Sequence, residues 1–287
     1  MMVKVAAPAK INLTLDVTGR LENGYHTVEM VMQTVDLTDV LEISPADTLH
    51  ITVGDADLCV DESNTIWKAT YLYSEAIGVQ PQFSVALQKN IPMQAGMAGG
   101  SADAAGVLVG LNAMFDHRLT TAQLCELGAK VGADVPFCIL GGTMLATGIG
   151  THLETLPPLS CGYILTAKPF CGVSTAAAYA AIDGEPYPAV RYAGEMINAL
   201  SLGDLSAVGR GMHNRFAEVL RLPEVEQLVA LLQESGALGA CMTGSGSAVI
   251  GLFADELTAK QAVDRVRSLC EQVNICRPWQ GGPKVFV

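Results

Sequence analysis

The sequence has few basic residues and no long run of apolar residues. Lys and Arg number 17 against 29 Asp and Glu, which gives a formal net charge of −12 at pH 7. Non-specific nucleic-acid binding needs a basic surface, so we expect no nucleic-acid partner. A membrane-spanning helix needs a run of roughly 20 apolar residues, and a signal peptide needs an apolar segment near its start. Neither pattern occurs, so we expect no membrane partner.

The cysteine spacings of zinc sites and of redox motifs are missing as well. None of the eight cysteines forms a CxxC pair, and none is clustered with histidine at zinc-site spacing. Several lie in apolar runs, where cysteine behaves as a small hydrophobic residue. We therefore expect reduced, mostly structural cysteines and a cytoplasmic protein.

Two common nucleotide-binding motifs are absent, yet one stretch is suited to binding a phosphate. Residues 91–105 contain neither GxxxxGK[ST] nor GxGxxG. They are rich in glycine and alanine and lead into a helical pattern over 102–115, for which Ser101 is the expected N-cap. A helix start offers unpaired N–H groups and a partial positive charge, and glycines let an anion come close. The alternative is a tight strand-to-helix turn whose small residues serve packing.

Two charged residues lie in settings that favour a chemical role. After a bend at Pro8, the alternation of apolar residues over 11–17 predicts a strand, and Lys10 lies at its start. A lone lysine on a strand is more often simply solvated. Asp134 lies among small and apolar residues just before Pro136. A carboxylate in such a setting often has a shifted pKa or a fixed partner, although an aspartate that only ends a helix is the commoner case.

An aromatic pair follows a turn near the start of the chain. Tyr25 and His26 come directly after Asn23-Gly24. Both rings have polar tips, so the pair can stack on a planar base and hydrogen-bond to it. The commoner alternative is a half-buried aromatic residue at the entry of a strand.

Two polar residues flank predicted elements before the glycine-rich stretch. Asn64 is a natural N-cap for the helix predicted over 65–77. Lys89 follows the strand predicted over 83–87 and lies a few residues before the glycines, where it can reach the same anion.

The remaining pattern predicts a mixed α/β protein of two parts. Half of the 287 residues are hydrophobic, so a large core is expected. The sequence predicts an amphipathic helix over 224–234 and a long final helix over 256–272. Residues 148–159 are rich in glycine and proline, so we expect the boundary there and two lobes over 1–155 and 156–287.

Four segments together resemble those of the GHMP kinases, which include galactokinase, homoserine kinase and mevalonate kinase. They occur in the family's order and read Pro8-Ala9-Lys10-Ile11-Asn12-Leu13, the loop 92–105, Gly132-Ala133-Asp134-Val135-Pro136, and Thr243-Gly244-Ser245-Gly246. Each motif is weak alone, but their joint order and spacing span nearly the whole chain. The resemblance implies an α+β fold of two lobes, an N-terminal S5-domain-2-like α/β lobe and a C-terminal ferredoxin-like α+β lobe.

The same resemblance implies an activity. Three segments, which begin at Pro8, Asn23 and Gly132, are most similar to family members that phosphorylate the 2-hydroxyl of a cytidine diphosphate-linked methylerythritol. These enzymes act in the non-mevalonate route to isoprenoid precursors. ATP would be the phosphoryl donor, with Mg²⁺. Asp134 would be the catalytic base and Lys10 its partner, which stabilises the developing charge.

The resemblance also assigns binding residues, but it assigns none to the metal. The nucleotide would be bound by Asn64, Lys89, Pro92, Met93, Gln94, Ala95, Gly96, Met97, Ala98, Gly99, Gly100, Ser101 and Ala102. The cytidine-linked substrate would be bound by Asn12, Tyr25, His26, Val173, Thr175, Tyr179, Thr243 and Gly244.

Two positions depart from the family's usual loop, GLGGGSSDAA. Ala98 replaces a glycine, and Ala102 lacks a hydroxyl that could bind phosphate or metal. Both changes lead us to expect weaker nucleotide binding than is usual in the family. The segment around Tyr179 also matches the family poorly.

Three alternatives stay open at the level of sequence. The first is a kinase of the same family that acts on another small alcohol, although a base-stacking pair at Tyr25 and His26 favours a cytidine-bearing substrate. The second is a non-catalytic nucleotide-binding paralogue, and the third is a structural protein with small-residue turns. The sequence is compatible with a monomer or a homodimer.

Overall fold

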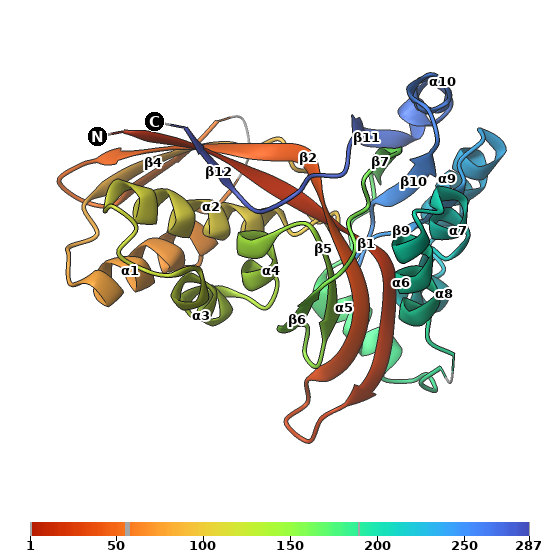
Figure 1. Ribbon diagram of the computed structural model, residues 1–287, viewed down its shortest axis with the longest axis horizontal. Coiled ribbons are helices and arrows are strands. Elements are labelled where there is room, and N and C mark those ends of the chain that lie inside the picture. The colour runs from red at the N-terminus through yellow and green to blue at the C-terminus, as the bar shows by residue number, and fades with distance from the viewer. Residues whose placement is uncertain (1, 55–57, 189, 287) are drawn as a thin grey trace.

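Two long antiparallel strands form the centre of the computed structural model, which describes residues 2–54, 58–188 and 190–286. Strand β1 (Val3–Arg20) pairs with β2 (His26–Pro45) along almost its whole length, and the resulting hairpin runs between the two halves of the molecule (Figure 1). The sequence predicted two strands separated by a bend at Pro8. The structure has one continuous strand, because a register shift between Pro8 and Ala9 absorbs the irregularity.

The first sheet has the order β12-β1-β2-β4-β3, and β5, β6 and β8 extend it at the sides. Helices α1 to α4 cover one face of its N-terminal half (Figure 1). The other strands are β3 (His50–Val53), β4 (Phe83–Gln88), β5 (Thr143–Thr147), β6 (His152–Thr155), β8 (His213–Asn214) and β12 (Lys284–Phe286). The helices are α1 (Thr65–Ile77), α2 (Gly99–Met114), α3 (Thr121–Val131) and α4 (Val135–Leu140).

Helix α2 packs closely on the central hairpin because two of its residues have no side chain. A Cβ atom on Gly106 would lie 2.7 Å from Leu41 Cδ1, and one on Gly110 would lie 2.7 Å from Ile43 Cδ1. Such distances are too short for carbon atoms, so a larger residue at either position would force the neighbouring side chains to move. The middle and C-terminal half of α2 therefore lie close against β1 and β2.

The second sheet has the order β11-β7-β10-β9, with every neighbouring pair antiparallel. In chain order its elements alternate as β7, α9, β9, β10, α10 and β11, which is the ferredoxin-like arrangement. Their bounds are β7 (Tyr163–Pro169), α9 (Pro223–Glu234), β9 (Gly239–Met242), β10 (Val249–Phe253), α10 (Glu256–Val266) and β11 (Cys270–Cys276). Four further helices lie between β7 and α9: α5 (Thr175–Ile182), α6 (Ala193–Leu202), α7 (Leu205–Arg210) and α8 (Arg215–Leu220).

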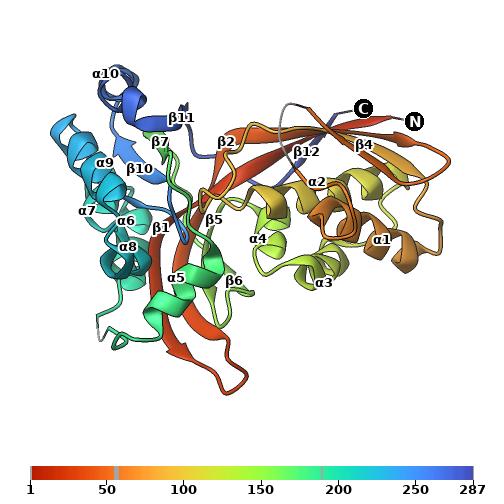
Figure 2. The same ribbon diagram turned by 180° about the vertical axis from the view of Figure 1, so that it is seen from behind.

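The α+β architecture of two lobes agrees with the prediction, but two details differ. The final helix ends at Val266 rather than at Gln272, because the chain from Cys270 pairs with β7 as a strand. The last strand, β12, returns to the first sheet and pairs with β1 (Figures 1 and 2). The division of the chain at 155/156 stays a prediction. Within the described ranges, every helix is too short or too polar to cross a membrane.

A buried ion cluster ties β2, β4 and α2 together under the glycine-rich stretch. The ammonium of Lys89 contacts the carboxylate of Asp39 and lies 2.8 Å from Asp103 Oδ2. Asp39 Oδ1 also accepts hydrogen bonds from the backbone N–H groups of Asn90 and Ile91, at 2.6 and 2.8 Å. Burial raises the pKa of Asp103 to about 8, against the opposing attraction of the Lys89 charge.

We expect this cluster to make stability depend on pH. The pKa of Asp103 is higher in the folded state than its ordinary value of 3.8, so stability is lost as pH rises toward 8. Each pH unit in that window then costs up to about 1.4 kcal/mol. In Asp103→Asn, which imitates the protonated form, this dependence should be absent. Urea unfolding of both proteins at pH 5, 6.5 and 8 measures it, and parallel curves would contradict the assignment.

Candidate active site

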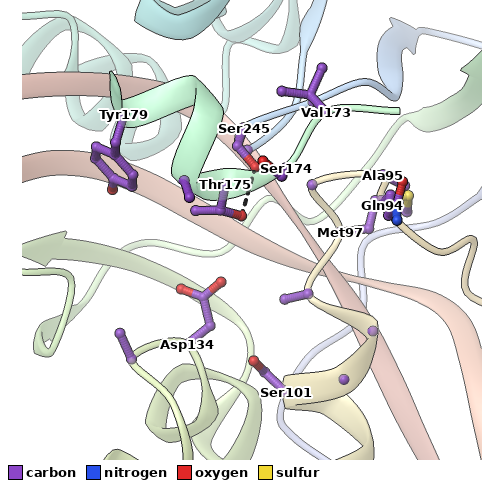
Figure 3. Close-up of a pocket in the computed structure, with 18 of the residues that line it drawn as sticks. Gln94, Ala95, Met97, Ser101, Asp134, Val173, Ser174, Thr175, Tyr179 and Ser245 are labelled. Atoms are coloured by element: carbon purple, nitrogen blue, oxygen red, sulfur yellow. Dashed lines mark hydrogen bonds between the residues drawn. The ribbon is translucent and has the colours of Figure 1, made fainter. Parts of the chain in front are cut away.

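A cavity of about 1440 Å³ lies where the central hairpin, the start of α2, the start of α4 and the second lobe meet. Figure 3 shows part of its lining, with Asp134 and Ser101 on one side and Thr175 and Ser245 on the other. Most of the residues singled out in the sequence line it: Lys10, Tyr25, His26, Asn64, Lys89, Pro92, Met93, Gln94, Ala95, Gly96, Met97, Ala98, Gly99, Gly100, Ser101, Asp134, Val173, Thr175, Tyr179 and Gly244. Asn12, Ala102 and Thr243 do not, and all three are buried.

The start of α2 presents unpaired N–H groups at this cavity. The helix begins at Gly99, and its N-cap is Ala98 in the left-handed conformation (φ 56°, ψ 34°), so the prediction of Ser101 as N-cap was wrong. Three small residues let the helix begin earlier than the helical pattern indicated. No side chain caps the helix. Its first N–H groups therefore remain available to an anion, and the hydroxyl of Ser101 lies on the cavity side (Figure 3).

The glycine loop, residues 92–101, is locked to the second lobe by a close approach of two turns. A Cβ atom on Gly96 would lie 2.1 Å from the carbonyl oxygen of Thr243, and one on Gly244 would lie 2.4 Å from the carbonyl oxygen of Gly96. Both glycines have positive φ, 71° and 56°. No other residue fits at either position without moving the backbone.

Backbone hydrogen bonds hold the loop from both sides of this contact. The N–H groups of Ser247 and Ala248 donate to the carbonyl oxygens of Gln94 and Ala95, both at 3.3 Å. On the other side, the N–H of Lys10 donates to the carbonyl of Met97 at 3.2 Å. The loop is thus fixed between β1 and the turn 243–247.

The two predicted catalytic residues lie together although 124 positions separate them. Lys10 Nζ lies 3.7 Å from Asp134 Oδ2, and the lysine side chain is only 5% exposed. Asp134 precedes α4 without capping it. Its carboxylate is therefore not engaged by the N–H groups of the helix, and it points into the cavity beside Lys10 (Figure 3).

Asn12 and Thr243, which do not line the cavity, support Lys10. The side-chain oxygen of Asn12 accepts a hydrogen bond of 2.8 Å from Lys10 Nζ. The backbone N–H of Asn12 donates to Thr243 Oγ1 at 2.9 Å. A residue of the second lobe thereby helps to fix the strand that carries the lysine.

Aromatic side chains gather at the hairpin end of the cavity. The rings of His26 and Tyr179 are stacked, with centroids 4.8 Å apart and an interplanar angle of 24°. Tyr179 also meets Phe216 edge-on at 5.0 Å, while Tyr25 is largely exposed. Burial, and to a lesser degree the charge of Asp134, raises the pKa of Tyr179 to about 12, so its hydroxyl keeps its proton.

Asn64 and Lys89 line the cavity, but their polar groups are already engaged. The side chain of Asn64 caps α1 by accepting from the N–H of Ile66 at 2.8 Å, and it donates to the carbonyl of Cys59. The ammonium of Lys89 is held by the buried carboxylates described above. We therefore interpret Lys89 chiefly as a support beneath the glycine loop.

The lining also includes residues to which the analysis of the sequence gave no role, among them Phe216 and Ser245. Phe216 packs edge-on against Tyr179 in the aromatic cluster. The hydroxyl groups of Ser245 and Thr175 form a hydrogen bond of 3.1 Å. Ser245 belongs to the glycine turn quoted as a motif, so its position could have been inferred. Phe216 lies in a short helix without a motif, and its place depends on tertiary packing alone.

Comparison with protein families identifies both lobes. Residues 64–142 match the GHMP kinases N terminal domain, and residues 196–272 match the GHMP kinases C terminal domain. Two curated relatives are 4-diphosphocytidyl-2-C-methyl-D-erythritol kinases. The one from Exiguobacterium sibiricum is 42% identical, and the one from Pelotomaculum thermopropionicum is 43% identical. Each alignment covers 96% of this chain and 98% of the relative.

Solved structures agree with this result. A crystal structure of 4-(cytidine 5'-diphospho)-2C-methyl-D-erythritol kinase is 30% identical, with a TM-score of 0.80 over 96% of this chain and all of the other. Homoserine kinase from Cytophaga hutchinsonii has a TM-score of 0.81 at 21% identity, over 99% of this chain and 97% of its own, and so shares the fold. This chain belongs to the GHMP kinase family.

Proposed function

We propose that this protein uses ATP to phosphorylate the 2-hydroxyl of 4-diphosphocytidyl-2-C-methyl-D-erythritol. One observation carries the proposal: Lys10 and Asp134 converge within 3.7 Å at the wall of a cavity that also contains the uncapped start of α2. A candidate general base for the attacking hydroxyl and a candidate anion site thus lie next to each other. The curated relatives with this name, about two-fifths identical, support the choice of substrate.

The geometry suits an in-line phosphoryl transfer. The triphosphate would lie against the N–H groups of the glycine loop and the start of α2, with its γ-phosphorus toward Asp134. The acceptor hydroxyl would give its proton to a carboxylate oxygen of Asp134 as its oxygen bonds to phosphorus. The bond from the γ-phosphorus to the bridging oxygen would break, and its electron pair would leave with ADP. Lys10, fixed by Asn12, would stabilise the charge on the oxygens.

A magnesium ion fits this arrangement as a companion of the nucleotide. Among residues 2–54, 58–188 and 190–286, no group of three His, Cys, Asp or Glu side chains could hold a metal. Magnesium bound to a triphosphate needs only one or two protein oxygens. The hydroxyl of Ser101 faces the cavity, which makes it a candidate ligand (Figure 3). The ion would neutralise oxygens of the β- and γ-phosphates.

The aromatic end of the cavity is suited to a nucleobase. Tyr25 has an exposed ring. His26, the next residue in the sequence, forms a stacked pair with Tyr179. A planar base can stack on such rings and bind their polar tips. This end therefore favours an acceptor that carries a base over mevalonate or homoserine.

An ATP-consumption assay tests the substrate. We expect turnover with 4-diphosphocytidyl-2-C-methyl-D-erythritol and little or none with mevalonate and homoserine. Preference for either of the latter would identify a different kinase of the same family. ATP binding without turnover on any alcohol would identify a non-catalytic paralogue.

Asp134→Asn tests the base. The amide keeps the shape of the side chain but cannot take a proton, so kcat should fall by roughly 100-fold or more. ATP binding, measured by calorimetry, should remain. Asp264→Asn, an exposed residue of α10, is the matched control and should leave kcat unchanged. An unchanged kcat in Asp134→Asn would contradict the role of this residue.

Ala98→Gly tests the departure in the glycine loop. Ala98 has a positive φ that costs an L-residue about 1–2 kcal/mol, whereas glycine adopts it freely. Glycine also raises the conformational entropy of the unfolded chain, which offsets part of this gain. We therefore expect the free energy of unfolding to rise by about 0.5–1 kcal/mol. The KM for ATP should fall, because the Cβ atom no longer faces the phosphates.

Ala113→Gly is the control for that substitution. It lies in the right-handed part of α2, where glycine should lower the free energy of unfolding by up to about 1 kcal/mol. Equal destabilisation in both variants would show that the conformation of Ala98 carries no cost.

A further inference from the structure

The carboxylate of Asp183 reaches from the second lobe to the central hairpin. Asp183 is the C-cap residue of α5, and its Oδ1 lies 2.8 Å from His26 Nε2 and 3.1 Å from an Arg20 nitrogen. Figures 1 and 2 show α5 beside the hairpin from opposite sides. A carboxylate at the C-terminal end of a helix opposes the helix dipole. The position of Asp183 is therefore explained by its contacts with His26 and Arg20 rather than by stabilisation of the helix.

Asp183 and Tyr179 hold the same imidazole ring in two ways. They lie four residues apart, so one face of α5 carries both. Tyr179 stacks on the face of the His26 ring, and Asp183 binds its edge. The His26 side chain is only 7% exposed, and its residue lines the cavity. The orientation of the ring is thus fixed before any ligand binds.

The hydrogen bond to Asp183 also decides which nitrogen carries the proton. A carboxylate oxygen accepts hydrogen bonds, so we assign the proton of the neutral imidazole to Nε2 of His26. In the neutral ring, Nδ1 is then a hydrogen-bond acceptor. Within the part of the chain that the structure describes, Nδ1 makes no hydrogen bond and is not fully buried. It is free to bind a ligand.

We propose that Asp183 is a positioning residue that makes this cavity prefer cytosine over uracil. Cytosine carries an exocyclic amino group that can donate to His26 Nδ1, whereas uracil has a carbonyl oxygen at that position. With the proton held on Nε2, two acceptors would face each other in the uracil complex, which leaves both unpaired at a cost. This inference rests on the proposed function only for the identity of the cytidine-linked substrate.

The test compares Asp183→Ala and Asp183→Asn with the wild type. Calorimetry measures the binding of CDP and UDP, and kinetics measure KM and kcat for 4-diphosphocytidyl-2-C-methyl-D-erythritol and its uridine analogue. In Asp183→Ala we expect the KM of the cytidine substrate to rise about tenfold and the cytidine-to-uridine ratio to fall at least tenfold. The kcat and the KM for ATP should stay within about twofold. In Asp183→Asn, Arg20 can keep the amide oxygen toward His26, so most of the preference should return.

Arg20→Ala separates positioning of the proton from mere attachment of α5. It removes one of the two contacts of Asp183 but leaves the carboxylate on His26, so it should retain the preference for cytidine. Loss of preference in Arg20→Ala equal to that in Asp183→Ala would overturn the proposal, as would an unchanged ratio in Asp183→Ala. If Asp183→Ala is unfolded at the assay temperature, Arg20→Ala and Asp183→Asn still decide. A wild type that binds CDP over UDP but phosphorylates neither substrate would refute the proposed function and leave this inference standing.

Discussion

The contact between Gly96 and Gly244 is the constraint on which the site depends. Each glycine lies where a Cβ atom would collide with the backbone of the other lobe, at 2.1 and 2.4 Å. Because the two turns touch through their backbones, the position of one determines the position of the other. The glycine loop, the hydroxyl of Thr243 and the strand that carries Lys10 are thereby placed in one frame. The proposed anion site and the proposed catalytic pair owe their proximity to this frame.

A protein with a large net negative charge has to bind polyphosphates through positively polarised groups at the site itself. The net charge of −12 opposes the approach of an anion, and the charge of Lys89 is balanced by the buried carboxylate of Asp39. Backbone N–H groups at an uncapped helix start and the ammonium of Lys10 lie near the loop. Such donors are fixed before the substrates bind, and preorganised donors stabilise developing charge without rearrangement. The cost of burying Lys10 is offset by Asn12 and Asp134.

The sequence predicted those parts of the molecule whose physics is local. The cap at Asn64 follows from a side chain that bonds to a nearby N–H group, and it is found. The long strand β1 was predicted as two strands divided at Pro8. A bulge depends on the partner strand, so it could not be predicted from the sequence of one strand alone. The predicted last helix was too long. Residues Cys270–Cys276 pair with β7 as a strand, and this tertiary contact cannot be seen in the local sequence.

The same distinction explains the candidate site. Lys10, Asp134 and the glycine loop were found because motifs mark them, and their convergence then followed from the fold. The engagement of Lys89 by Asp39 and Asp103 was not foreseen, since Asp39 lies outside the quoted motifs and Asp103 lies in one without an assigned role. Asp183 was missed for a similar reason: its partners, Arg20 and His26, lie more than 150 positions away. Charge pairing across lobes is decided by packing and cannot be read from spacing.

A crystal structure of the protein with 4-diphosphocytidyl-2-C-methyl-D-erythritol and a non-hydrolysable ATP analogue tests the central claim most directly. The account predicts the acceptor hydroxyl within hydrogen-bond distance of both Asp134 and Lys10, with the γ-phosphate on the N–H groups of residues 96–101. An acceptor hydroxyl bound away from Asp134, or phosphates that do not touch the glycine loop, would contradict it.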